Sequence, residues 1–347
     1  MLGTLPKLAD KAFVLGFLLP AFLFLISILA LVSDLKTTKE LADKLVQKDA
    51  LETLALFVLL VWGLAILMMM LNHTQYRMLE GYLWPLSKVK WLKTRQLAKF
   101  EKLTARIEVL ADKWESLSDE DRRQHNWLRR HLVTSPTDKR FVLPTRFGNS
   151  IRAFEFYSNE VYGADSIPLW LRLATVIPKE YQTALEDARA QVNCLVNLCY
   201  FAMMIGMLAA IRFVESFDWR SWELRTLFAT QQLAFLMAIA GAVVVAWVAY
   251  ELSIERVRWW GGLVNVAFDC YLPSLAKKLG YKLPPNGKTQ REFWEAVSRR
   301  AIYHRELEPS EWPRADATDN GGGKRINNEK NDENESHDAG DGSEEDD

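Results

Sequence analysis

The most telling absence in this chain of 347 residues is that of charge from four long stretches, which cover residues 12–33, 53–72, 195–211 and 233–250. The hydrocarbon core of a bilayer is about 30 Å thick, and a helix needs about 20 apolar residues to cross it. Each stretch meets or nearly meets that length. The same absence disfavours a proton-coupled transporter, because such proteins place ionisable groups inside the membrane. We therefore expect an all-α membrane protein with four transmembrane helices.

Residue patterns typical of catalysis are also scarce. No G-x-S-x-G motif occurs, and Gly287-Lys288-Thr289 differs from a phosphate-binding loop because Lys282 stands where the first glycine belongs. The three cysteines, Cys194, Cys199 and Cys270, lie in or close to the predicted spans, which favours reduced thiols. The five histidines lack the spacing of metal ligands. They are His73, His125, His131, His304 and His337. We expect no metal, no cofactor and no enzymatic activity.

Basic residues gather on one side of the predicted spans. The section between the second and third stretch carries dense lysine and arginine beside both of its ends, and the segment after the fourth adds Arg256 and Arg258. Short loops rich in lysine and arginine stay in the cytoplasm. We therefore expect this section to be cytoplasmic, and an even number of spans places both termini there as well.

The chain then divides into five parts. We expect two transmembrane hairpins with a helical cytoplasmic domain between spans two and three, further cytoplasmic helices, and an acidic tail too polar to fold. The ranges are 1–72 for the first hairpin with spans 12–33 and 53–72, 73–192 for the cytoplasmic domain, 193–254 for the second hairpin with spans 195–213 and 233–252, 255–308 for the C-terminal helices, and 309–347 for the disordered tail.

Three features concern the shape of individual helices. Pro20 lies in the middle of span one, where the missing N–H predicts a bend unless a neighbour satisfies the freed carbonyl. Span two has no helix breaker before Gly81. A helix after Pro178 is expected to run without a break into span three. Both exits are thus expected to be rigid joints between the membrane and the cytoplasmic domain.

Small residues recur every four positions in the last two stretches. Helices associate in lipid through close packing of small side chains, so we expect the two stripes to face each other, or one of them to face a second protomer in a homo-oligomer. The stripes are Ala202, Gly206 and Ala210 in span three, and Ala234, Ala238, Ala242 and Ala246 in span four.

Tryptophans and basic residues alternate just beyond span two. They are Trp84, Lys88, Lys90, Trp91, Lys93 and Arg95. Each basic residue near an anionic membrane surface contributes roughly 1 kcal/mol to binding, so this cluster predicts contact with anionic lipid headgroups. We expect no nucleic-acid binding, because no recognised module accompanies the charge.

Apolar residues from Phe100 to Leu117 follow at alternating three- and four-residue steps. This spacing predicts a helix whose apolar seam packs on another helix of the same chain or, less favoured, forms an oligomeric coiled coil. Ser118 is expected to begin the next helix. Thr289 and Glu292 form a capping-box pattern that opens the last one.

Charged and polar residues concentrate between Pro144 and Pro178. The candidate polar cluster comprises Arg146, Asn149, Arg152, Glu155, Asp165 and Arg172. We expect Phe147-Gly148-Asn149 to form a turn and cap and Gly163 to stop the helix that follows. Arg152 and Glu155 are expected to pair, with Asp165 and Arg172 bonding across to them. The cluster is interpreted either as a pocket for a ligand or partner or, preferably, as a charge network that satisfies buried turns.

The same stretch carries a resemblance. The run PTRFGN at 144–149, followed by Arg152-Ala153, Glu155, Tyr157, Tyr162-Gly163, Asp165 and Leu169-Trp170-x-Arg172-Leu173, resembles a segment of uncharacterised bacterial membrane proteins, and Glu80-Gly81-Tyr82 is similar to them as well. The resemblance covers most of the chain from span two onward. It implies a bacterial inner-membrane protein with paired spans around a cytoplasmic domain, and it brings no catalytic residues.

Three classes of function fit this pattern. The leading hypothesis is a membrane-anchored interaction or signalling module whose cytoplasmic domain binds an unknown cytoplasmic protein. The alternative is an oligomeric pore or channel-like effector gated by that domain. An enzyme that uses the region of Arg152, Glu155 and Asp165 on a lipid or nucleotide ranks last, because no nucleophile or metal cluster accompanies it.

Overall fold

The computed structural model describes residues 10–32, 50–132, 134–216, 230–304 and 312. Its regular structure is helical, and no strand occurs within these ranges. In chain order the elements are α1 (Lys11–Phe13), the π-helix η2 (Val14–Leu18), α2 (Leu19–Val32), α4 (Ala50–Glu80), the 3₁₀ turn η3 (Leu86–Lys88), α5 (Lys90–Ala111), the 3₁₀ turn η4 (Trp114–Ser116), α6 (Asp119–Leu132), the 3₁₀ turn η5 (Lys139–Phe141), α7 (Arg146–Tyr162), α8 (Ser166–Leu173), α9 (Lys179–Ser216), α11 (Thr230–Lys278) and α12 (Gly287–Tyr303).

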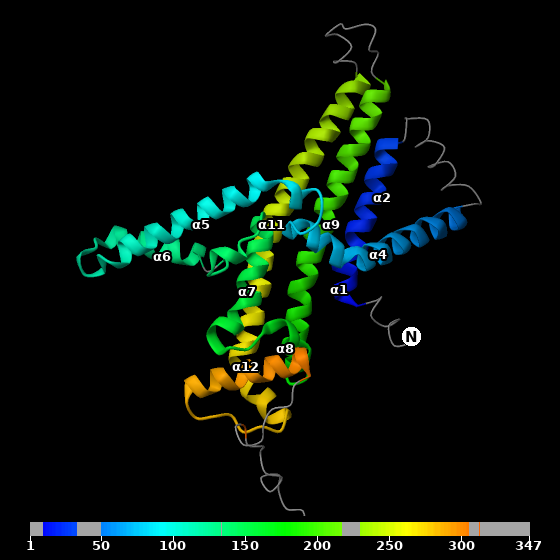
Figure 1. Cartoon of the computed structure of the whole chain (residues 1–347). Helices are drawn as coiled ribbons and strands as arrows, with labels where there is room; N and C mark the ends of the chain where they lie inside the picture. Colours follow the sequence, from blue (N-terminus) through cyan, green and yellow to red (C-terminus); the bar gives the residue numbers. More distant parts are fainter. Residues whose placement is uncertain (1–9, 33–49, 133, 217–229, 305–311, 313–347) are drawn as a thin grey trace, which may run out of the picture.

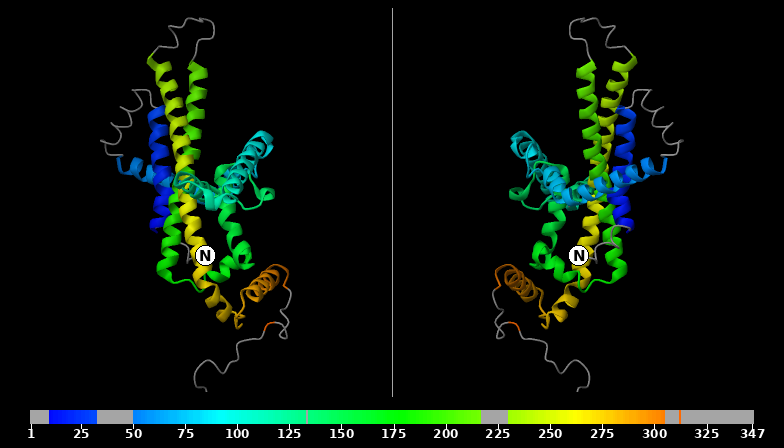
Figure 2. Two further views of the ribbon diagram at one scale, coloured as in Figure 1. Left: turned by 90° about the vertical axis from the view of Figure 1, so that its left-hand side faces the viewer. Right: turned by 90° about the vertical axis from the view of Figure 1, so that its right-hand side faces the viewer.

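Four helices are long and apolar enough to cross a membrane, at Lys11–Leu29, Leu51–Glu80, Lys179–Ser216 and Gln232–Lys278. This confirms the four predicted membrane-crossing segments by length and composition. Helices α2, α9 and α11 run alongside one another, whereas α4 crosses them (Figures 1 and 2). Spans one and two therefore meet at a crossing and do not lie antiparallel along their lengths.

The N-terminal helix widens into a π turn in the segment just before Pro20, which lacks a backbone N–H donor. In an α-helix the N–H of residue 20 would bond the carbonyl of Gly16, and proline has none to give. The helix forms a π turn over Val14–Leu18 at this point, and the side-chain amide of Asn197 in α9 donates to the Gly16 carbonyl at 2.8 Å. A neighbouring helix thus satisfies the carbonyl that Pro20 frees, which is the condition under which the sequence analysis expects no bend.

A buried network of amides fixes the crossing of α4 with α9. Gln75 donates to Asn197 Oδ1 at 3.0 Å, and Asn72 Nδ2 and the Tyr76 hydroxyl both donate to Asn193 Oδ1. Neutral amides in an apolar setting must bond to one another, because an unmade hydrogen bond there is expensive. The C-terminal half of α4 is consequently held at one place on α9, and this explains why α4 crosses the other helices.

Helices α9 and α11 form the axis of the molecule. They pack antiparallel along most of their length (Figure 1). The two small-residue stripes approach at Gly206, where an added Cβ would lie 3.1 Å from the Cβ of Ala242. Ala202 and Ala242 are buried, and Ala210, Ala238 and Ala246 are half-buried, whereas Ala234 is exposed. The two stripes therefore pack against each other around Gly206, whereas Ala234, near the start of α11, lies outside this contact.

One hydrophobic core joins segments that the sequence divides into two domains. Helices α7 and α8 pack on α11, and α12 packs on α7 and α8. Phe147, Leu169, Phe268 and Phe293 are all buried in this single core. The expected boundary at residue 255 is not visible, because α11 continues through it to Lys278. Trp312, within the segment expected to be disordered, packs on Phe293 with ring centroids 5.5 Å apart. The rest of that segment, residues 309–311 and 313–347, lies outside the described ranges.

Two of the expected helix caps are wrong in detail. Helix α7 is capped by Thr145, whose hydroxyl accepts from Gly148 N, so Phe147-Gly148-Asn149 is already helical. Helix α12 is capped by Asn286, one turn before the proposed capping box. In both cases a residue with a short polar side chain lies just upstream, and that side chain accepts a hydrogen bond from a free N–H group of the first turn. Gly163 ends α7 with φ of 74°, as predicted, and Ser118 caps α6 through Asp121 N.

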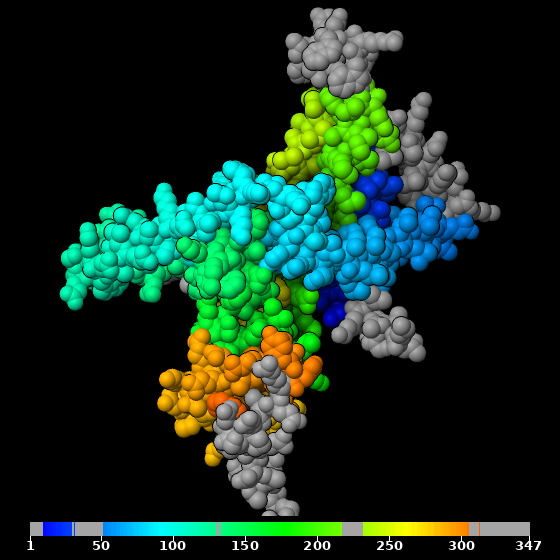
Figure 3. All heavy atoms as spheres, viewed as in Figure 1, coloured from blue at the N-terminus to red at the C-terminus, as the bar shows by residue number. Residues whose placement is uncertain are grey.

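Helices α5 and α6 form an arm that projects from the side of the molecule (Figure 3). They pack on each other, with Phe100, Leu110 and Leu128 buried. The apolar seam of α5 is therefore covered by a helix of the same chain, which confirms the favoured of the two interpretations.

Two adjacent glycines of α11 allow a matched test of this packing. A Cβ at Gly261 would lie 2.4 Å from Cδ1 of Phe154, whereas one at Gly262 would meet nothing within 4 Å. We expect Gly261→Ala to lower the free energy of unfolding by about 1–3 kcal/mol through overpacking. Gly262→Ala should raise it by up to about 1 kcal/mol, because alanine is the better helix former. Denaturant unfolding of the purified protein in detergent measures both, and equal effects would contradict the contact between α7 and α11.

The bond between Asn197 and Gly16 allows a second test. Asn197→Leu should lower the free energy of unfolding by about 1–2 kcal/mol, since it removes a buried hydrogen bond between membrane helices. Pro20→Ala restores a backbone N–H for the Gly16 carbonyl. Asn197→Leu should therefore do less damage in the Pro20→Ala background than in the wild type, and unfolding of the four proteins measures this. The same loss in both backgrounds would show that Asn197 does not serve that carbonyl.

Candidate functional site: a cationic pocket between α5, α7 and α11

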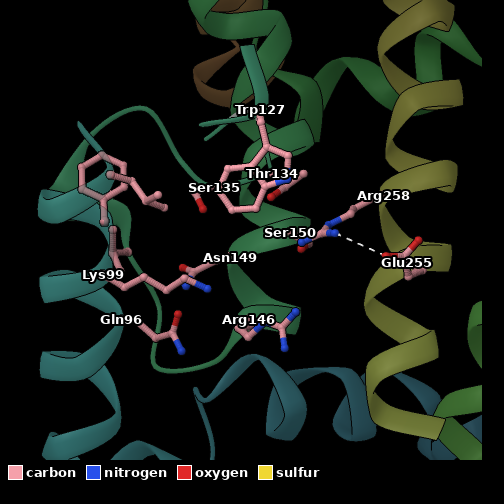
Figure 4. Close-up of a pocket in the computed structure, with 13 residues that line it drawn as sticks. Gln96, Lys99, Trp127, Thr134, Ser135, Arg146, Asn149, Ser150, Glu255 and Arg258 are labelled. Atoms are coloured by element: carbon pink, nitrogen blue, oxygen red, sulfur yellow. Dashed lines mark ion pairs between the residues drawn. The ribbon is translucent and has the colours of Figure 1, made fainter. Parts of the chain in front are cut away.

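A cavity of about 320 Å³ lies where the arm meets the main body. Its walls come from α5, α6, α7, α11 and the segment before α7 (Figure 4). The polar residues that line it are Gln96, Lys99, Thr134, Ser135, Arg146, Asn149, Ser150, Glu255 and Arg258, and the larger apolar ones are Phe100, Leu103, Trp127 and Val142. Three of these side chains are cationic, and each comes from a different helix.

Arg146 is positioned by the start of α7 and by an acid on α11. It is the first residue of α7, directly after the capping Thr145. Its Nη1 atom donates to both carboxylate oxygens of Glu251, at 2.7 and 2.8 Å. Because both bonds use the same nitrogen, this contact does not occupy Nε or Nη2 of Arg146. The pair is about one third exposed on each side, so it fixes the geometry more than it stabilises the fold.

Arg258 has fewer hydrogen-bond partners for its guanidinium group than Arg146 has. Its nearest carboxylate, Glu255, lies at 3.6 Å, which is an ion pair beyond hydrogen-bond distance. Within the ranges that the structure covers, its buried Nε has no hydrogen-bond partner. A buried guanidinium nitrogen without an acceptor carries a desolvation penalty that an additional oxygen would remove.

Lys99 completes the set from α5. Figure 4 shows it extending from α5 towards the side chains of α7. Among the described residues, the ion pairs of the pocket are those of Arg146 and Arg258, and neither includes Lys99. Burial, and after it the neighbouring Arg146 and Arg258, lower the pKa of the Lys99 ammonium below its ordinary value. Three cations thus face two carboxylates, and the pocket has a surplus of positive charge.

The six residues of the predicted polar cluster do not gather in one place. Arg146 and Asn149 line the pocket, although the Asn149 amide bonds both backbone groups of Leu143. Arg152 and Glu155 pair at 3.5 Å as expected, and Arg152 also donates to the Tyr82 hydroxyl.

The expected bonds from Asp165 and Arg172 to that pair are replaced by local ones. Asp165 caps α8 through Ile167 N, and Arg172 donates to the Pro168 carbonyl at 2.6 Å. Both residues find a backbone partner within four positions, which removes the need for a distant one.

Sequence reasoning missed the residues that give the pocket its charge. Lys99, Arg258 and their neighbours Glu251 and Glu255 were outside the predicted cluster. One local signal was present, because Glu251, Glu255 and Arg258 follow at four- and three-residue steps and therefore share a helix face. Nothing local connects that face with Lys99 or Arg146.

The predicted headgroup cluster lies on the surface. Trp84, Lys88, Lys90, Trp91, Lys93 and Arg95 are all exposed. The Arg95 guanidinium lies 5.5 Å from the ring centre of Trp91. Their contact with lipid stays a prediction. Among the described residues, no three histidine, cysteine, aspartate or glutamate side chains are grouped to hold a metal ion.

A double-mutant cycle tests the pair that orders the pocket. Arg146→Gln and Glu251→Gln, singly and together, should reveal a coupling of about 0.5–1 kcal/mol in the free energy of unfolding, as expected for a partly exposed pair. The control pair is Arg212 and Glu215 in α9, which are 45% and 60% exposed at 3.6 Å and should couple by less than about 0.5 kcal/mol. A coupling no larger than that of the control would show that the contact with Glu251 does not order Arg146.

Comparison with protein-family models, with curated proteins and with solved structures found no match to this chain.

Proposed function

We propose that this chain is a membrane-anchored interaction or signalling module, in which the soluble helices bind a cytoplasmic protein and the spans hold that site at the membrane and relay its movement. The observation that carries the proposal is the continuity of α9 and α11. Each begins or ends in the soluble core and contains one of the charge-free stretches. Helix α4 also joins a charge-free stretch to this core, through Tyr76 and Leu79 near its C-terminal end.

The lengths of these helices support a mechanical link. Helix α9 has 38 residues and α11 has 49, which correspond to about 57 and 73 Å at a rise of 1.5 Å per residue. Both exceed the roughly 30 Å of a hydrocarbon core. Because the two helices pack on each other in both regions, a shift of α7, α8 or α12 against them is transmitted along their axis.

We place the chain in a bacterial inner membrane, with both termini and the helices α5 to α8 and α12 in the cytoplasm. The dense basic residues beside the exits of spans two to four support this orientation. A second candidate function is the oligomeric pore. It is favoured by α4, on which Leu51, Leu59 and Met70 are between 68% and 78% exposed, so that either lipid or another copy of the chain must cover this apolar helix.

Thiol labelling tests the orientation. In a chain without its three native cysteines, Ser116→Cys at the tip of the arm and Ser221→Cys in the loop between spans three and four should differ. A membrane-impermeant maleimide added to intact spheroplasts should label Ser221→Cys at once and Ser116→Cys only after lysis. The reverse order would invert the topology and place the soluble helices outside.

Planar-bilayer recording separates the two functions. We expect no discrete currents from the purified full chain once its incorporation has been verified. Discrete single-channel currents would contradict the leading proposal and establish the pore. A variant without the arm, residues 90–132, would then show whether the soluble helices gate it.

A further inference from the structure

We propose that the pocket between α5, α7 and α11 binds a phosphate group. The inference deepens the proposed function and rests on it in one respect, since it assumes that the soluble helices adjoin the cytoplasmic leaflet. The ligand belongs to one chemical class, a phosphate monoester or diester, and it has two candidate sources: the headgroup of an anionic lipid and a soluble phosphate compound.

The charge of the pocket indicates an anion. Lys99, Arg146 and Arg258 come from three helices that converge on one cavity, and Glu251 and Glu255 leave one positive charge uncompensated. Like charges that line one cavity repel each other, and an anion bound between them removes that cost. Helix packing holds them here, and burial, followed by the neighbouring Arg146 and Arg258, lowers the pKa of Lys99.

The hydrogen-bond donors of the pocket fit a phosphate in particular. Arg258 has a buried Nε without a partner among the described residues, and the contact with Glu251 leaves two nitrogens of Arg146 unused. Guanidinium groups bind phosphate oxygens with paired N–H donors, and lysine adds a compact charge. Ser150 adds a neutral polar group at the same wall. A phosphate monoester offers three unesterified oxygens, one for each cation. A diester offers two unesterified oxygens and two weaker ester acceptors, whereas a carboxylate has two oxygens in all.

The position and size of the pocket favour the lipid source. Glu251 directly follows the charge-free stretch that ends at Tyr250, and Arg258 lies seven residues further, about 11 Å along the helix. The core of about 30 Å grows to about 40–45 Å with both headgroup layers, so one layer is about 5–7 Å thick. The helix from Glu251 to Arg258 therefore extends through that layer to just beyond it. The volume of about 320 Å³ is at the lower end for ligand sites and suits a headgroup. Phe100, Leu103 and Trp127 give the pocket an apolar wall as well.

A pair of charge-matched variants tests the proposal in the full-length protein. Lys99→Gln with Arg258→Gln removes two cations from the pocket, and Lys113→Gln with Arg123→Gln removes two exposed cations of the same arm that lie outside both the pocket and the predicted headgroup cluster. The probes are dioleoylphosphatidylglycerol added to the protein in neutral detergent micelles, and inorganic phosphate and glycerol phosphate at constant ionic strength. Binding is read from the shift in melting temperature and from lipid occupancy in native mass spectrometry.

We expect the pocket variant to bind phosphatidylglycerol at least about tenfold more weakly than the wild type, and the control variant to stay within about twofold. Binding of the lipid alone identifies the headgroup as the source, and equally cation-dependent binding of inorganic or glycerol phosphate identifies a soluble compound. Among the described residues the Lys99 side chain has no ion pair, so the single variant Lys99→Gln should show an intermediate loss, and it guards against misfolding of the double variant.

Two results would overturn the inference: no binding of any of the three probes, or an equal loss of binding in the pocket and control variants. Neither result would contradict the proposed function, because thiol labelling and planar-bilayer recording test the proposed function separately. Conversely, an inverted topology with intact phosphate binding would remove the proposed function and leave the pocket.

Discussion

The antiparallel packing of α9 on α11 is the constraint on which the rest of the structure depends. Along the charge-free stretches this packing uses small residues, with Gly206 against Ala242, because lipid offers no hydrophobic advantage for joining helices. Beyond the stretches the same two helices bury Val192, Val257 and Phe268 in the larger hydrophobic core. One pair of helices thus joins the charge-free stretches to that core. Helices α7 and α8 pack on that pair, α12 packs on α7 and α8, and the cationic pocket uses α11 as one wall.

The second organising feature is the hydrogen-bond network of polar groups near the apolar stretches, in which Asn72 Oδ1 and Gln75 Oε1 alone have no partner among its described amides. Pro20 frees a carbonyl, Asn197 bonds it, and Gln75 bonds Asn197 in turn. This chain of bonds attaches the first helix and α4 to the axis through neutral groups, so no buried charge is required. The pocket shows the opposite situation. Its guanidinium and ammonium groups are positioned by packing, and the protein's own carboxylates compensate them only in part. We interpret the first arrangement as structural and the second as a site for a ligand.

The sequence predicts the parts of this fold that depend on local composition and spacing. The four apolar helices, the unbroken exit of α9 after Pro178 and the stop at Gly163 all follow from residues within a few turns of each other. The crossing of α4 could not be predicted in this way, because it depends on amides such as Asn72 and Asn193 that are distant in sequence. The pocket could not be predicted for the same reason, because Lys99, Arg146 and Arg258 line one cavity only after three helices have packed together. Arg172 was assigned to a distant network because its nearby backbone partner, the Pro168 carbonyl, leaves no trace in a pattern of side chains.

The most direct test of this account is amide hydrogen exchange along α11 in the full-length protein in lipid nanodiscs. If α11 is one rigid element, amides from Tyr250 to Val257 should exchange as slowly as those of the soluble core around Phe268, with no gap where the apolar stretch ends. The corresponding part of α9, around Asn193, should behave in the same way. A rapidly exchanging segment between Tyr250 and Val257 would show that the helix breaks at the membrane surface. The soluble core would then be tethered to the spans without being coupled to them, which contradicts the central claim.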